Sequence, residues 1–155
     1  MTWDENKRYR KNKNMDRCCM YGSPETNNRK IPADSILFIL EMNNDTNKIL
    51  GIGMVRNKPI SGKYFIYENG NYNRYIFVGK HRIDRSEFQD NEMVIIKALD
   101  IICFKGNYHM KRGYGLKSFP NVILEKAKPT IDLEKEITDM FKKRFSIYAN
   151  TVATT

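Results

Sequence analysis

The sequence predicts an α+β domain: a small, mainly antiparallel open β-barrel flanked by helices. Short apolar runs separated by turn residues fill the middle of the chain, which is typical of antiparallel strands. Apolar residues at helical spacing follow in the last part of the chain. The chain has 155 residues, of which 41% are hydrophobic. It can therefore bury a core, and its length predicts a single domain.

We expect four strands, at residues 35–42, 48–55, 63–68 and 74–79, with residues 82–84 as an extension of the fourth. An Asn-Asn-Asp turn separates the first two strands, and Asn69-Gly70 is a hairpin signal between the last two. Gly51 and Gly53 lie on one face of the second strand. Their missing side chains would let another backbone or a ligand approach the sheet.

Two helices are expected after the strands. Ser86 and Gln89 form a capping-box pattern, which predicts a helix that begins near Ser86 or soon after. Residues 92–104 are apolar nearly all round, which is compatible with a buried helix or a strand. Residues 121–128 are interpreted as a short strand. The C-terminal amphipathic helix is predicted by five apolar residues on one face: Leu133, Ile137, Met140, Phe141 and Phe145.

The domain organisation has three parts: a basic flexible arm at residues 1–17, a single domain at residues 18–148 and a frayed tail at residues 149–155. The arm is either solvated or orders on a polyanion. It carries six cations and three acids: Lys7, Arg8, Arg10, Lys11, Lys13 and Arg17 against Asp4, Glu5 and Asp16. Residues 18–34 are interpreted as a loop because Gly, Ser and Pro interrupt them.

The net charge of +9 favours a polyanion as partner, although a basic protein without such a partner has the same charge. The three cysteines, Cys18, Cys19 and Cys103, imply no disulfide framework and favour a reducing, intracellular compartment. No apolar run is long enough to span a membrane. The abundant amino acids of the chain are ones that AT-rich codons encode. This composition fits an AT-rich genome, such as that of a large DNA virus or a parasite. A viral protein would then act in the host cytoplasm, the viral factory or the virion.

Two runs of the sequence carry a resemblance to a known family. They are I-P-A-D-S-I-L-F-I-L-E-M at residues 31–42 and K-I-L-G-I-G-M-V at residues 48–55. Together they resemble the PUA-like superfamily, which includes the EVE, ASCH and YTH domains, over about residues 30–105. The resemblance implies a small barrel with an aromatic slot that reads a modified or flipped base. Trp3 is the one tryptophan of the chain, so the tryptophan cage of YTH domains is absent and the slot would be built from Tyr or Phe.

The candidate site is centred on the glycine-rich basic segment 104–120, which contains no acid. Its cations are suited to phosphate, and tyrosines there and in the preceding strands offer faces for bases. The expected nucleic-acid-binding residues are Arg74, Lys80, Arg82, Lys105, His109, Lys111, Arg112, Tyr114 and Lys117. The expected base-stacking residues are Tyr72 and Tyr75. The alternative interpretations are a solvated loop and tyrosines that pack in the core.

The sequence therefore predicts a non-catalytic module that binds RNA or DNA. No Walker loop, dinucleotide fingerprint or zinc-ligand pattern is present, so we expect no cofactor, no metal and no catalytic residue. Two alternatives stay open. One is a virion component or protein–protein adaptor, and the other is a small nuclease or base-modifying enzyme.

Overall fold

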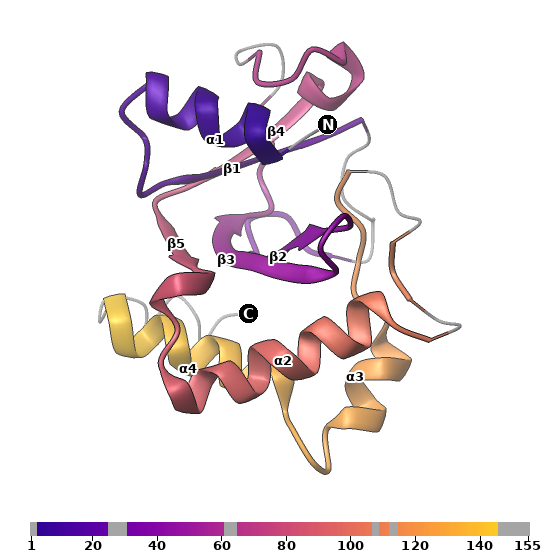
Figure 1. Ribbon diagram of the computed structural model, residues 1–155. Coiled ribbons are helices and arrows are strands. Elements are labelled where there is room, and N and C mark those ends of the chain that lie inside the picture. Colours follow the sequence, from indigo (N-terminus) through magenta and orange to yellow (C-terminus); the bar gives the residue numbers. More distant parts are fainter. Residues whose placement is uncertain (1–2, 25–30, 61–64, 107–108, 112–114, 146–155) are drawn as a thin grey trace.

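A computed structural model describes residues 3–24, 31–60, 65–106, 109–111 and 115–145. Over these ranges the chain is an α+β protein with four α-helices, two 3-10 helices and five strands, which confirms the predicted fold class. The elements lie in layers (Figure 1). Helix α1 (Trp3–Asn12) lies against a two-stranded sheet, a three-stranded sheet comes next, and the remaining helices lie on its other side.

The five strands form two open sheets, and all their pairings are antiparallel. β1 (Cys19–Ser23) pairs with β4 (Tyr75–Gly79). The second sheet has the order β2-β3-β5, with β2 (Ile36–Asn43), β3 (Lys48–Arg56) and β5 (His81–Asp84). Within the described residues no pairing closes these sheets into a barrel. Alternation of apolar residues predicts a strand but not its neighbour, so it did not reveal this division.

The central hairpin is confirmed, whereas the loop expected at residues 18–34 and the described part of the strand expected at residues 63–68 are wrong. β2 and β3 pair along their length, with one bulge between Glu41 and Met42. β1 lies within the stretch that we expected to be a loop, and all five of its residues are buried. Residues 65–68 form no strand, because the Asn73 side chain accepts hydrogen bonds from the backbone N–H groups of Ile66 and Tyr67. The 3-10 helix η1 (Gly70–Asn73) takes the place of the expected hairpin turn.

Three helices follow the strands. The ambiguous stretch is helical: α2 (Asp90–Phe104) begins at a capping box formed by Gln89 and Glu92, just after the 3-10 helix η2 (Arg85–Glu87). The strand expected at residues 121–128 is wrong, since α3 (Asn121–Ala127) forms there directly after Pro120. α4 (Leu133–Phe145) is confirmed, and its predicted apolar face is buried except at half-buried Phe145.

The prediction of a flexible arm is also wrong for residues 3–12. These residues form α1, whose Asn6 and Arg10 side chains are buried, with 2% and 8% of their surface exposed. Buried Asn6 and Arg10 attach this helix to the sheet together with half-buried Trp3 and Tyr9, so its attached side mixes polar and aromatic residues. A search for hydrophobic periodicity could therefore not distinguish it from a solvated tail.

The main core lies between the three-stranded sheet and helices α2 and α4. The two sheets meet at glycines, where the backbones come very close. A β-carbon at Gly79 would overlap the Met54 carbonyl oxygen, and one at Gly53 would overlap the Tyr21 hydroxyl. The expectation that Gly53 permits a close approach is confirmed, and the approaching groups belong to the protein itself.

Candidate nucleic-acid interface

A buried polar network joins the two sheets beneath the candidate site. Glu41 of β2 is 3% exposed, and its carboxylate accepts a 2.6 Å hydrogen bond from the Tyr21 hydroxyl of β1. The Arg82 guanidinium of β5 binds both carboxylate oxygens, at 2.8 Å from Nε and 2.6 Å from Nη2. Arg82 also contacts Asp84 at 2.9 Å. β1 and β2 each supply one member of this cluster, β5 supplies Arg82 and Asp84, and the guanidinium lies between two carboxylates.

The surroundings of this network shift the pKa values of Tyr21 and Arg82. Burial, reinforced by the neighbouring Glu41 carboxylate, raises the pKa of Tyr21 well above its usual value. Burial alone would lower the pKa of Arg82, but its hydrogen bonds to Glu41 and Asp84 raise it above its usual value. Arg82, which we expected to bind a phosphate, is paired with Glu41 and Asp84, and its side chain is 12% exposed.

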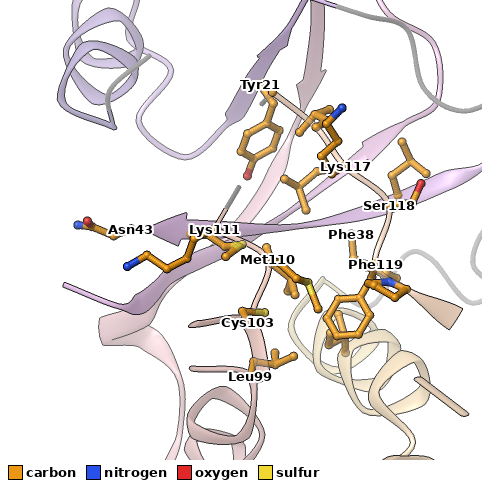
Figure 2. A pocket seen from close by; sticks show the side chains of 18 of the residues that line it. Tyr21, Phe38, Asn43, Leu99, Cys103, Met110, Lys111, Lys117, Ser118 and Phe119 are labelled. Carbon is orange, nitrogen blue, oxygen red and sulfur yellow. The ribbon is translucent and has the colours of Figure 1, made fainter. Parts of the chain in front are cut away.

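A cleft of about 1360 Å³ lies beside β2, which is an edge strand of the three-stranded sheet. Figure 2 shows Tyr21 pointing its hydroxyl into this cleft, and Phe38, Met110 and Phe119 around its apolar floor. Trp3 lines it as well, and its indole N–H donates a 2.7 Å hydrogen bond to the Met42 carbonyl. The cleft therefore combines an aromatic rim with an apolar floor.

The charges around the cleft are mixed. Lys111 and Lys117 line it, but so do the carboxylates of Asp4, Asp45 and Glu134. The Lys111 ammonium donates a 2.8 Å hydrogen bond to Asn47. The described part of the lining thus carries no positive excess, and phosphate is better held elsewhere.

The positive charge gathers instead along α1 and the turn after it. Lys7, Arg8 and Lys11 are exposed on α1, and Lys13 and Arg17 are exposed in the turn. Cys19 pairs with Gly79, so exposed Lys80 lies at the same end of the β1–β4 sheet as Arg17 (Figure 1). We call the set of Lys7, Arg8, Lys11, Lys13, Arg17 and Lys80 the basic N-terminal face. The exposed acids in the same segment are Asp4 and Asp16.

Hydrogen bonds from buried polar side chains fix the position of this face. The Asn6 amide donates to the Met20 carbonyl at 2.6 Å and to the Tyr67 hydroxyl at 2.7 Å. The Arg10 guanidinium donates to Asn6 at 2.8 Å and to the Cys18 carbonyl at 3.1 Å. Because α1 is held at both turns, its exposed cations are pre-positioned rather than carried on a loose tail.

The predicted site residues are spread over several places. Tyr72, His109, Lys111 and Lys117 line the cleft. Lys80 belongs to the basic N-terminal face, whereas Arg74 and Lys105 are exposed away from the cleft lining. Tyr75 is half-buried and packs against the cluster of Cys19, Tyr21, Val55 and Phe77. Arg112 and Tyr114 lie outside the described residues.

The sequence did contain a signal for the residues that we missed. The cations at positions 7–17 stood out as a charge run, but we assigned them to a flexible arm rather than to a structured surface. Trp3 stood out as the one tryptophan, and the structure places it at the cleft.

In the described ranges, the side chains that could hold a metal ion or act as a thiol nucleophile are dispersed or buried. No group of three or more His, Cys, Asp or Glu side chains is placed there to hold a metal ion. Burial raises the pKa of both the Cys19 and the Cys103 thiols to about 12, so neither is a good nucleophile at neutral pH. In the same ranges no helix is long and apolar enough to cross a membrane.

No protein-family model, curated protein or solved structure matches the chain. The fold and the site therefore define it only as an α+β protein with a basic helical face and an aromatic cleft.

Proposed function

We propose that the protein is a non-catalytic nucleic-acid-binding module whose phosphate contacts are made by the basic N-terminal face. The observation that carries this proposal is the docking of α1, which fixes a row of exposed cations through buried Asn6 and Arg10. Binding releases counterions from the polyanion, and this release is the source of affinity without regard to sequence.

The aromatic cleft supplies the second half of the proposed mechanism. Trp3 begins α1 and lines the cleft, so a strand that follows the exposed side of α1 reaches the cleft at its N-terminal end. Tyr72 and Trp3 are the rings that a base would meet there, and each stacked base contributes on the order of 1–3 kcal/mol. Lys111 and Lys117 line the same cleft, but its acids leave no positive excess there, so the phosphate contacts stay with the basic N-terminal face.

The salt dependence of binding tests the phosphate contacts. If about five cations each neutralise a phosphate of a single strand, log Kobs falls with log salt at a slope of about −3.5. We expect this slope in fluorescence anisotropy with labelled single-stranded RNA and DNA of about 20 nucleotides. A slope near zero would refute the proposal.

A matched pair of triple variants tests the location. In the first variant, Lys7, Arg8 and Lys11 are each changed to Gln. Each phosphate contact contributes about 0.7 to the salt slope, so the loss of three contacts lowers the slope by about 2. If the variant and the wild type bind equally at about 1 M salt, the variant then binds about 50-fold more weakly at about 0.15 M salt. The control variant changes three other exposed lysines to Gln: Lys126 of α3, Lys128 just after α3, and Lys143 of α4. Both variants have the same net charge. Equal losses would mean that binding depends on overall charge and not on α1.

The relationship to the PUA-like superfamily stays a proposal as well. It is supported by the residues that suggested it, because they form the β2–β3 hairpin, and Gly53 of that hairpin lies where the two sheets meet. Reading of a modified base would follow only from this relationship. A binding panel of plain and modified oligonucleotides tests it, and equal affinities throughout the panel would count against it.

A further inference from the structure

The outward face of α2 carries two exposed apolar side chains. Val94 is 62% exposed and Ile101 is 57% exposed, although the opposite face of the same helix contributes Ile95, Ile96 and Leu99 to the core. Single exposed apolar residues are common on protein surfaces. Two on the same line of one helix need an explanation, because Val94 and Ile101 are seven residues, or about two turns, apart.

A charged residue lies beyond each of these two apolar side chains, along the same line of the helix. Asp90 and Lys105 are the exposed residues at the two ends of α2, and no ion pair joins either to another described residue. At 3.6 residues per turn, Asp90, Val94 and Ile101 lie within about 40° of the helix circumference. Lys105 is the C-terminal cap of α2 and has an extended backbone, but its N–H still donates to the Ile101 carbonyl at 3.1 Å, so it follows at the end of the same line. We call these four residues the α2 stripe. Its order is acid, apolar, apolar, base.

We propose that the α2 stripe is the contact between two copies of this chain, packed antiparallel about a two-fold axis. Val94 lies four residues after Asp90, and Ile101 lies four residues before Lys105. Both spacings share one centre, between Lys97 and Ala98. When two helices cross antiparallel at that centre, Val94 of each copy meets Ile101 of the other. At the same time Asp90 of each copy meets Lys105 of the other.

The charge pattern favours a second copy of the chain as the partner, and it favours the antiparallel orientation. A parallel pair would place Asp90 against Asp90 and Lys105 against Lys105, which is repulsive. Ala98 is half-buried at the centre, and its small side chain permits a close approach of the two helices. Exposed Lys97 can extend its aliphatic stem alongside the contact and keep its ammonium in water. One helix face is smaller than a standard interface, so the dimer is weak and depends on concentration.

Light scattering coupled to size-exclusion chromatography, over a wide concentration range at low salt, tests the contact. The apparent mass of the wild type should rise from 18.3 kDa towards twice that value. Val94→Lys and Ile101→Lys should each keep the mass at the monomer value. Both positions are exposed, so neither change disturbs the core. Phe65→Lys is the matched control, since Phe65 is 77% exposed and lies in another layer.

A charge exchange tests the orientation. Asp90→Lys alone and Lys105→Asp alone each create two like-charge contacts, so each variant should be monomeric. The double variant restores both attractive pairs and should dimerise as the wild type does. An equimolar mixture of the two single variants should form a heterodimer, because one copy then carries two lysines and the other two aspartates.

The result that overturns the proposal is a wild type that stays monomeric at every concentration. Dissociation by Phe65→Lys but not by Ile101→Lys would also overturn it, as would single charge variants that dimerise like the wild type. None of these outcomes bears on nucleic-acid binding, since the α2 stripe and the basic N-terminal face share no residue. A loss of oligonucleotide binding would equally leave the dimer untouched.

Discussion

Replacing Glu41 by Gln tests whether the buried network holds the two sheets together. The side chain keeps its shape, and the Tyr21 hydroxyl can still donate to the remaining carbonyl oxygen. The new amide nitrogen, however, takes the place of Oε1 and faces the Nη2 donor of Arg82, so the guanidinium loses its 2.6 Å hydrogen bond. It keeps the 2.8 Å bond from Nε, which shares the remaining oxygen with Tyr21. The charge of Arg82 is then left with Asp84 alone, at 2.9 Å.

The magnitude follows from the burial of the pair. Removing one partner of a buried ion pair costs about 3–5 kcal/mol. The Arg82 side chain is still 12% exposed, so water relieves part of this cost and about 3 kcal/mol is expected. With a total stability of about 5–15 kcal/mol, such a loss moves the midpoint of urea unfolding by about 1–3 M.

Urea unfolding followed by circular dichroism measures this shift, and a double-mutant cycle assigns it to the pair. Arg82→Met should destabilise the protein by a similar amount. The variant with both changes should be more stable than the sum of the two losses predicts, with a coupling of about 1–3 kcal/mol. Asp139→Asn, in the exposed Lys135–Asp139 pair of α4, is the control and should leave the midpoint unchanged. A loss below about 0.5 kcal/mol for Glu41→Gln would refute the reasoning.

Two further predictions concern packing and acid stability. Gly79→Ala should destabilise the protein by about 1–3 kcal/mol, because the new β-carbon meets the rigid Met54 carbonyl. Gly70→Ala is the control and should be tolerated, because a β-carbon there meets no atom within 4 Å. Thermal melts of the two variants compare them directly. Hydrogen bonds from Arg144 hold the pKa of Glu92 below its usual 4.5, so in the unfolded chain this carboxyl binds its proton at higher pH than in the folded protein. The contribution of Glu92 to folding stability is therefore complete above about pH 4.5 and is lost as the pH falls through the lower folded pKa. Arg144→Gln removes the hydrogen bonds behind this shift and should flatten this part of the stability–pH curve. Identical curves for the variant and the wild type would contradict the assignment.

Elements with a strong apolar period could be predicted from the sequence. β2, β3 and α4 lie where the apolar pattern placed them, because each buries one face against the main core. β1 could not be recognised, since its five residues C-M-Y-G-S show no alternation and are buried by pairing with β4. α1 was missed for a related reason, because Asn6 and Arg10 make its buried contacts.

The sequence predicted the types of residue in the candidate site but not their positions in the fold. The cations and tyrosines were visible as residue types, yet the fold sends Arg82 into an ion pair and Tyr75 against the core. Partners such as Glu41 are far from Arg82 in sequence, and no local pattern reports a bond between them. The charge run before residue 18 was recognised, but its role depended on a helix that only the tertiary contacts explain.

The attachment of α1 has a practical consequence for handling the protein. The helix touches both sheets, through the bond of the Trp3 indole to Met42 and that of the Asn6 amide to Met20. Proteolytic trimming of the first dozen residues would therefore remove a brace between the two halves of the molecule, and would uncover backbone carbonyls that α1 now satisfies. Purification tags are accordingly better joined to the opposite end of the chain, where they leave this brace intact.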